Sequence, residues 1–202
     1  MERFFNRRFS LNTVSEEEKI RWRAAEGLAA LGPLARPAVP ELEKLLYTNF
    51  WHSSIKAAAY ALAAIEPEGI NVLTNAVRPQ TEWSGMCAIW ALGQHPAKGT
   101  KVIPFLIGAT TSPGEGTACG AIQVLGLFHT DADLVIPALT NALFSTNVAV
   151  RKDAAHALGQ FGAQAVAAVP LLKSLTNNPV VGANAFEALK QIQPNAARPG
   201  GK

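Results

Sequence analysis

The sequence predicts an all-α fold, a right-handed α-solenoid of about five two-helix repeats followed by a terminal helix. A leucine returns every 30 to 34 residues, an alanine stands four residues before it in each copy, and in four copies a proline stands twelve residues after it. A recurrence of this length is typical of stacked repeat arrays, in which each unit contacts only its neighbours. The leucines are Leu28, Leu62, Leu92, Leu125, Leu158 and Leu189, the alanines are Ala24, Ala58, Ala88, Ala121, Ala154 and Ala185, and the prolines are Pro40, Pro104, Pro137 and Pro170.

The fifth repeat indicates how each unit is built. Ala154 and Leu158 belong to an apolar stripe at helical spacing, which predicts a first helix, helix A. Gly159 and Gly162 follow, and we expect them to loosen the end of helix A because glycine most easily adopts the left-handed conformation found there. Pro170 then falls near the first turn of a second helix, helix B, where a missing N–H costs nothing.

The inter-helix turn differs between repeats. In the first and fifth repeats, nineteen residues separate an arginine from the proline, Arg21 from Pro40 and Arg151 from Pro170. In the second repeat Asn71 stands at the proline position, nine residues after its leucine, so we expect a turn that is three residues shorter.

The recurring alanine predicts where helices cross, because a methyl group there permits the closest approach of two helices.

Local chemistry marks the ends of the array. Ser15 with Glu18 forms a capping box, and Asn178 before Pro179 is typical of a helix start. Phe4, Phe5 and Phe9 precede the first repeat, where they are expected either to fold over its open edge or to anchor a neighbouring protein. The expected ranges are an N-terminal arm at 1–14, repeats at 15–48, 49–80, 81–112, 113–146 and 147–177, a closing helix at 178–193 and a disordered tail at 194–202.

Composition narrows the classes of function. Hydrophobic residues make up 49% of the chain, enough for a buried core. Charged residues make up only 16%, against about 25% in an average protein. The net charge of +3 is small. No apolar run approaches the roughly 20 residues that span a bilayer, and the first residues lack the apolar core of a signal peptide, which predicts a cytoplasmic protein.

With these elements in place, the chain resembles the HEAT-repeat family, and its Arg-x-x-Ala-Ala-x-Ala-Leu-Gly strings are similar to the phycobilisome-lyase-like branch. The matching strings are 151–159 with 168–172, 21–28 and 88–93, and the resemblance covers about residues 16–192. Members of the family are mostly protein-binding scaffolds, and a minority are enzymes or lyase subunits that handle chromophores. The resemblance therefore implies a binding role, with a chromophore lyase or lyase subunit as the alternative. A metal-dependent enzymatic subset carries His-Glu pairs, which are absent from this sequence.

No catalytic, cofactor-binding or metal-binding residue is predicted. No two of the histidines stand at ligand spacing; they are His52, His95, His129 and His156. Asp131 and Asp133 precede a helix expected near Leu134, and their charges complement its N-terminal dipole. Cys87 and Cys119 fall within the helical pattern and are expected to be buried free thiols.

The strongest candidate site is a set of positions on the B helices, three and four residues after the proline position, which we call the B-helix column. It is mostly polar and uncharged, whereas a nucleic-acid interface needs lysines and arginines in register; nucleic-acid binding is therefore disfavoured. We expect the column to form the concave floor and to hold a peptide or protein segment through amide and hydroxyl groups; the alternative is a merely solvated face. Its members are Glu43/Lys44, Thr74/Asn75, Ile107/Gly108, Thr140/Asn141 and Lys173/Ser174.

Loop aromatics are a second candidate site. Tyr47, Phe50, Trp51 and Trp83 gather around the starts of the second and third repeats. Aromatic residues are enriched at binding hot spots, and they also anchor loops to a core. The function expected from the whole sequence is a non-catalytic protein-interaction scaffold without a cofactor.

Overall fold

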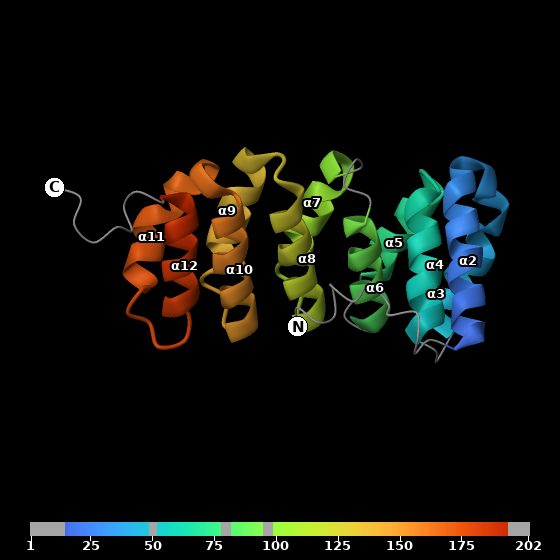
Figure 1. Cartoon of the computed structure of the whole chain (residues 1–202), viewed down its shortest axis with the longest axis horizontal. Helices are drawn as coiled ribbons and strands as arrows, with labels where there is room; N and C mark the ends of the chain where they lie inside the picture. The colour runs from blue at the N-terminus through green and yellow to red at the C-terminus, as the bar shows by residue number, and fades with distance from the viewer. Residues whose placement is uncertain (1–14, 49–51, 78–81, 95–98, 194–202) are drawn as a thin grey trace. The chain divides into compact units, whose positions relative to one another are not determined.

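The computed structural model describes residues 15–48, 52–77, 82–94 and 99–193 of the chain (Figure 1). Every regular element among these residues is a helix. The chain divides into two compact units, Met1–His95 and Pro96–Lys202, each of which is described by itself. The division falls within residues 81–112, the range expected for the third repeat.

Unit 1 has two layers of helices (Figure 1). Helices A lie side by side in one layer and helices B form the other. The A layer contains α2 (Glu16–Leu31), α4 (His52–Ala64) and α6 (Glu82–Gly93), and the B layer contains α3 (Val39–Thr48), preceded by the 3₁₀ segment η1 (Gly32–Ala38), and α5 (Glu68–Ala76).

Unit 2 repeats this two-layer arrangement. Its A layer contains α8 (Glu115–Phe128), α10 (Val148–Gln160) and the closing helix α12 (Gly182–Ile192). Its B layer contains α7 (Gly99–Ala109), α9 (Ala132–Ala142) and α11 (Val169–Leu175), with the 3₁₀ segment η4 (Gly162–Ala168) before α11.

Each B helix packs against the A helix of the next repeat. In unit 1 α3 packs on α4 and α5 on α6, and in unit 2 α7 packs on α8, α9 on α10 and α11 on α12. This pairing is the one that stacked two-helix repeats require, and the expected all-α repeat fold is confirmed. Within the described ranges, no helix is both long enough and apolar enough to cross a membrane.

The recurring alanines lie in the tightly packed interior, with one exception. Ala88, Ala121, Ala154 and Ala185 are completely buried, as is Ala58 apart from 2% of its surface. Ala24, the first member of the column, is exposed. The buried members belong to α4, α6, α8, α10 and α12, whereas Ala24 belongs to α2, which begins the A layer of unit 1.

Glycine allows a similarly close approach later in the same helices. A methyl group built on Gly126 of α8 would lie 3.1 Å from the Cβ atom of Ala157 in α10. One built on Gly159 of α10 would lie 3.0 Å from the Cα atom of Ala188 in α12. Helix α10 continues through Gly159 to Gln160, so this glycine lies in the last turn of helix A, where it makes room for α12.

The turns of the first and fifth repeats are alike, as their spacing predicts. Gly32 and Gly162 have positive φ angles of 53° and 54°, which side chains disfavour. Each begins a seven-residue 3₁₀ segment. Pro40 and Pro170 then stand at the second residue of α3 and α11, within the first turn of helix B.

The second repeat has the shorter turn that the sequence predicts. Helix α4 ends at Ala64 and α5 begins at Glu68, with no intervening 3₁₀ segment. At this tight turn a methyl group on Gly69 would collide with the backbone carbonyl group of Leu62. Glycine is therefore required there by the path of the backbone.

Three expected helix starts need correction. Pro104 and Pro137 lie inside α7 and α9, because these helices begin about one turn earlier than in the first and fifth repeats. Both prolines are exposed, so the carbonyl group that loses its helical partner is able to bond to water. The closing helix begins at Gly182 instead of Asn178, and the Asn178 side chain accepts hydrogen bonds from the N–H groups of Val180 and Val181 in the turn before it.

Polar side chains fix the starts of two A helices. Ser15 Oγ accepts a hydrogen bond from the N–H of Glu18 at 3.2 Å, as its capping motif predicts. Asn147 Oδ1 accepts from the N–H of Ala149 at 2.8 Å, while its Nδ2 donates to Glu115 at 2.8 Å. Arg151, the arginine of the repeated string, donates to the carbonyl oxygens of the preceding loop at 2.6 and 3.0 Å.

The alanine column predicts which substitutions the stack tolerates. Replacing Ala88 or Ala121 by leucine should lower the free energy of unfolding by about 1–3 kcal/mol, because the interior has no room for the larger side chain. Ala24→Leu is the matched control and should change it by less than about 0.5 kcal/mol, since Ala24 is exposed. Denaturant unfolding followed by circular dichroism measures both; equal effects at Ala24 and Ala121 would contradict this packing.

Two glycine-to-alanine substitutions allow the effect of helix propensity on stability to be measured apart from the effect of a close contact. Nothing lies within 4 Å of a methyl group built on Gly27, so Gly27→Ala should stabilise the protein by up to about 1 kcal/mol. Gly69→Ala should destabilise it by about 1–3 kcal/mol or more through the collision with Leu62. The same unfolding assay tests the pair, and two shifts of the same sign would argue against the turn geometry.

Candidate functional site

In unit 1 the B-helix column lies on α3 and α5. Lys44 and Asn75 are exposed, whereas Glu43 and Thr74 are half-buried. Lys44 Nζ lies 2.6 Å from Glu41 one turn earlier on α3. The α3 part of the column is thus an ion-paired surface, and Asn75 adds an amide on α5.

In unit 2 the column lies on α7, α9 and α11. Asn141, Lys173 and Ser174 are exposed and Thr140 is half-buried. On α7 the corresponding positions are Ile107, which is half-buried, and Gly108, beside which a methyl group would meet open space. On α7 the column therefore offers the open backbone at Gly108 beside Ile107. On α9 and α11 it offers amide and ammonium groups.

The hydroxyl groups of the column bond within their own helices. Thr74 Oγ1 donates to the carbonyl oxygen of Asn71 at 3.0 Å, Thr140 Oγ1 donates to that of Ile136 at 2.7 Å, and Ser174 Oγ donates to that of Leu171 at 2.7 Å. Each hydroxyl has one hydrogen to donate. A ligand would therefore find donors on the amide and ammonium groups of the column, whereas the hydroxyls can only accept.

In the part of the chain that the structure describes, the side chains of Asn75, Asn141 and Lys173 make no hydrogen bond and no ion pair. An asparagine amide offers two donors and an acceptor, and a lysine ammonium offers three donors. These three side chains are the groups of the column best able to exchange water for a ligand.

Only two of the four loop aromatics lie within the described residues. Tyr47 is exposed over 44% of its surface at the end of α3. Trp83, near the start of α6, is half-buried, with its ring centroid 4.3 Å from that of His52. Next to it Ser84 Oγ donates to the carbonyl oxygen of Leu46 at 2.6 Å, which ties α6 to α3. Phe50 and Trp51 lie outside the described residues.

An aromatic cluster that the sequence analysis missed joins the three A helices of unit 1. The ring centroid of Trp22 lies 5.8 Å from that of Tyr60 and 6.1 Å from that of Trp90, and those of Tyr60 and Trp90 are 6.3 Å apart. Lys56 Nζ lies 4.2 Å from the centroid of Trp90, within the range of a cation–π contact. When the repeats are aligned, Glu26 of the first repeat takes the position of Tyr60 and Trp90. The first repeat contributes Trp22 to the cluster instead, which stands one helical turn before Glu26.

Both cysteines are buried free thiols, as expected. Burial raises the pKa of the Cys87 thiol to about 12, against a smaller opposing effect of Lys56, and burial lowers the pKa of Lys56. Burial, followed by the neighbouring Asp153 carboxylate, raises the pKa of Cys119 to about 12. Both thiols are therefore protonated at neutral pH, which makes them poor nucleophiles.

The described histidines and close carboxylates do not converge on a common centre. Within the described ranges there is no group of three or more His, Cys, Asp or Glu side chains placed to hold a metal. Asp133 lies in the first turn of α9 and Asp131 directly precedes it, where helix-dipole complementarity was expected. His129 stands at the C-terminal end of α8, and its ring centroid lies 5.7 Å from that of Phe161. His95 lies outside the described residues.

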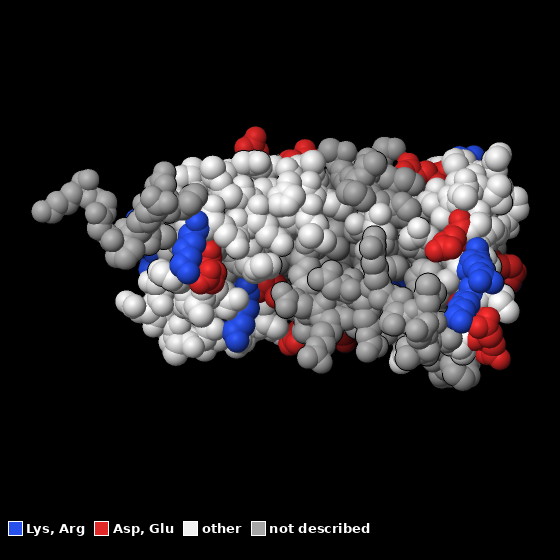
Figure 2. Space-filling model, viewed as in Figure 1, with Lys and Arg blue, Asp and Glu red and all other residues white. Residues whose placement is uncertain are grey.

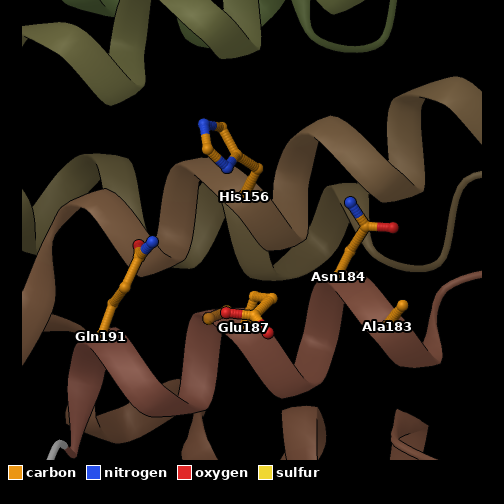
Figure 3. Close-up of a pocket in the computed structure, with 6 residues that line it drawn as sticks. His156, Ala183, Asn184, Glu187 and Gln191 are labelled. Carbon is orange, nitrogen blue, oxygen red and sulfur yellow. The ribbon is translucent and has the colours of Figure 1, made fainter.

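A small polar pocket of about 210 Å³ lies between α10 and α12 (Figure 3). Asn184, Glu187 and Gln191 line one side of it from α12, and His156 lines the other from α10. The His156 Nε2 atom lies 3.3 Å from the amide nitrogen of Gln160 on its own helix. The pocket offers a single imidazole beside amides, and it is smaller than the roughly 300–1,000 Å³ of most ligand sites.

These features define an α-helical repeat protein with exposed polar side chains on both its A and its B helices. The family model described as HEAT repeats matches residues 104–190, and the one described as PBS lyase HEAT-like repeat matches residues 20–48. Both models describe HEAT-type repeats, so the chain is similar to the HEAT-repeat family over these two ranges, and the phycobilisome-lyase-like model matches part of the first repeat. No curated protein matches it in sequence.

Solved structures with the same fold include an engineered protein and a karyopherin. The engineered protein is 20% identical, with a TM-score of 0.55 over 91% of this chain and 94% of its own. Kap121p bound to the SUMO protease Ulp1p is 17% identical, with a TM-score of 0.60 over 95% of this chain and 23% of its own. Kap121p bound to the extreme C-terminus of the protein phosphatase Cdc14p gives a TM-score of 0.60 at 18% identity, over the same shares. The chain thus spans 23% of the karyopherin's length, and at these identities the likeness concerns the fold alone.

Thiol burial gives a chemical prediction. Because their pKa values are raised to about 12, Cys87 and Cys119 should resist alkylation by iodoacetamide at pH 8 in the folded protein and react readily in denaturant. The unfolded thiols ionise near pH 8.5, so folding stability should fall as pH rises above about 9 towards 12. Mass spectrometry counts the alkylated thiols; rapid modification of both in the folded protein would contradict their burial.

Proposed function

We propose that the chain is a non-catalytic interaction scaffold that binds a peptide or protein segment along the exposed face of its B helices. The observation that carries this proposal is the set of amide and ammonium groups on the B-helix column, Asn75, Asn141 and Lys173. They are supported on rigid helices and are not engaged by the rest of the described protein. The proposal is made for each unit by itself.

The chemistry of these groups suits a peptide backbone. An asparagine amide can donate to a backbone carbonyl group and accept from a backbone N–H at the same time. Such contacts recognise an extended chain with little regard to its sequence, whereas Lys173 adds a preference for a carboxylate on the ligand. In unit 2 the open backbone at Gly108 leaves room for a ligand to lie close to α7.

In unit 1 the proposed surface also includes an exposed aromatic side chain, Tyr47. Tyr47 follows Lys44 by three residues on α3, so the two side chains share one face of the helix. Tyrosine contributes a large contact area at low conformational cost and is enriched at binding hot spots. We include Lys44, Tyr47 and Asn75 in the proposed surface of unit 1, with Trp83 as a support for the adjoining loop.

The structural neighbours support a binding role without identifying a partner. The solved Kap121p structures contain Ulp1p in one case and the extreme C-terminus of Cdc14p in the other. A helical repeat fold of this kind therefore holds protein segments in at least one protein. Figure 2 draws the side on which the A helices lie, and there the lysines and arginines among the described residues stand beside acidic side chains.

Three substitutions test this function. Partners captured with the full chain would be mapped to their binding segments, and the dissociation constant of each segment measured by fluorescence anisotropy. The triple variant combines Asn75→Ala, Asn141→Ala and Lys173→Ala. It should weaken binding about fivefold for a segment held by unit 1 and about 30-fold for one held by unit 2, because each lost polar contact contributes about 1 kcal/mol and each 1.4 kcal/mol is a factor of ten. Asn75→Ala alone and the Asn141→Ala, Lys173→Ala pair assign the loss to one unit.

The matched control places the same changes on the A helices. Lys152→Ala, Asn184→Ala and Gln191→Ala remove one ammonium and two amide groups from α10 and α12, and binding should stay within about twofold. A triple B-helix variant that binds every segment as tightly as the wild type would refute the proposed surface. Loss of binding in the control alone would move the site to the A helices.

A further inference from the structure

Helices α2, α3 and α4 of unit 1 line an apolar groove that has polar groups at one end. Its volume is about 390 Å³, within the roughly 300–1,000 Å³ of most ligand sites. The lining belongs to the described part of the chain, whereas the expected arm at 1–14, with Phe4, Phe5 and Phe9, lies outside it. We call this site the α2–α3 groove; its apolar wall includes Ala24, Leu28, Leu42, Leu45 and Ala58.

The polar side chains among the described residues that line the groove are Arg21 and Ser54. Arg21 lies in the second turn of α2 and Ser54 in the first turn of α4, and these helices run in the same direction because α3 returns between them. Leu45, in the last turn of α3, lies towards the same end. Leu28 and Ala58 continue the apolar wall away from it. The groove therefore has one polar end and an apolar remainder.

The hydroxyl group of Ser54 is buried and makes no hydrogen bond within the described ranges. The residue exposes only 7% of its surface. Ser84 has the equivalent position in α6, because each serine stands eight residues before the leucine of its repeat. The Ser84 hydroxyl donates to the carbonyl oxygen of Leu46 on α3 at 2.6 Å. No described B helix precedes α3, so Ser54 lacks the oxygen acceptor that its equivalent has, and an unmade bond at a buried group is costly.

Arg21 supplies a positive charge at the same end of the groove. Its side chain is half-buried, and its Nη2 atom lies 3.5 Å from the carboxylate of Glu17 one turn earlier. This long ion pair leaves most of the five guanidinium N–H groups available. In the fifth repeat the equivalent Arg151 donates to carbonyl oxygens of the preceding loop, whereas Arg21 makes no such bond to a described residue. Both polar groups of the groove are thus donors without an acceptor inside it.

We propose that the α2–α3 groove binds a single-chain carboxylate amphiphile, a fatty acid of medium length. The carboxylate accepts hydrogen bonds from Arg21 and Ser54, and the alkyl chain lies along the apolar wall towards Leu28. A carboxylate has about four lone-pair sites, so it satisfies both donors at once, and hydrogen bonds to charged groups are the stronger kind. The site is separate from the B-helix column, none of whose members lines it.

The size of the groove sets the length of the chain. Leu28 lies seven residues after Arg21, or about 10 Å along the axis of α2. An extended chain advances about 3.5 Å over three bonds, so an alkyl chain of about nine bonds covers that distance. A cavity of about 150 Å³ holds the six carbons of benzene, so a volume of about 390 Å³ holds about fifteen carbons. Decanoate and dodecanoate fall between these two limits.

An extended peptide suits the groove less well than an alkyl chain. The wall beyond the polar end consists of alanine and leucine side chains, which offer no partner to peptide N–H and C=O groups. Burial of such groups without a partner costs free energy, whereas burial of methylene groups is favourable. The charge at one end and the apolar wall beyond it therefore match a fatty acid.

Fatty-acid binding to the full chain tests this inference. A dansyl-labelled undecanoate is the fluorescent probe, and octanoate, decanoate and dodecanoate displace it. Affinity should rise about two- to fourfold for each added methylene as alkyl surface leaves water, with one molecule bound per chain. Decanol and decylammonium, which lack the carboxylate, should bind at least about tenfold more weakly. Equal affinity for the three head groups would overturn the proposal.

Arg21→Gln and its matched control Arg23→Gln locate the site. Arg23 is exposed on the same helix two residues later and does not line the groove. Arg21→Gln should weaken decanoate binding about tenfold or more, whereas Arg23→Gln should leave it within about twofold. Ser54→Ala should weaken it about fivefold through the lost hydrogen bond. Equal effects of the two arginine substitutions, or unchanged binding in both Arg21→Gln and Ser54→Ala, would contradict this site.

Ala24→Leu tests the apolar part of the groove. Ala24 is exposed and lines the groove, so a leucine there occupies space that the alkyl chain needs without disturbing the interior. Decanoate binding should weaken about fivefold or more, because several methylene contacts are lost, while circular dichroism shows unchanged unfolding. Full affinity in this folded variant would place the alkyl chain elsewhere and refute the proposal.

Discussion

Close approach of successive A helices is the constraint on which the rest of the structure depends. Helices cross at 8–10 Å according to the side chains between them. In this chain alanine fills the crossing position, and glycine replaces it near the ends of α8 and α10, where a neighbouring alanine leaves no space for a methyl group. Because so little volume separates the helices, the A layer of each unit is nearly continuous apolar packing.

Both layers keep exposed polar side chains, such as Lys152 and Glu187 on A helices and Asn75 and Lys173 on B helices. The groups that the A layer buries lose their reactivity, as the raised pKa values of Cys87 and Cys119 illustrate. On the B helices the threonine and serine hydroxyls bond to their own backbone, whereas asparagine and lysine side chains extend into solvent. The B-helix column is therefore mostly uncharged and includes two exposed amide side chains, Asn75 and Asn141.

The fold could be predicted from the sequence because its determinants are local and repeat along the chain. The spacing of alanine, leucine and proline fixes the two-helix repeat, and the shorter second turn follows from counting residues between Leu62 and Asn71. The starts of α7 and α9 could not be obtained in this way, because a proline inside a helix and one at its first turn look alike in sequence. Gly159 could be placed near the end of helix A from the sequence, whereas its close contact with α12 could not, because that helix begins more than twenty residues later.

The candidate site was predictable only in part. Periodicity identified which positions lie on the B helices, but it could not reveal that Thr74, Thr140 and Ser174 satisfy their hydroxyl groups internally. The aromatic cluster escaped detection because Trp22 stands one turn away from the aligned position of Tyr60 and Trp90. Such contacts depend on how side chains from separate helices meet, and repeat alignment contains no information about that.

Residue-by-residue amide hydrogen exchange tests the packing of the A helices most directly, because protection reports the free energy of local opening. The close-approach account predicts that the amides of Ala88, Ala121 and Ala154 exchange only through large-scale unfolding, while that of Ala24 in the outermost helix exchanges much faster. Fast exchange at the three buried alanines, or protection of Ala24 equal to theirs, would contradict the claim that stacking of A helices on this column holds the fold together.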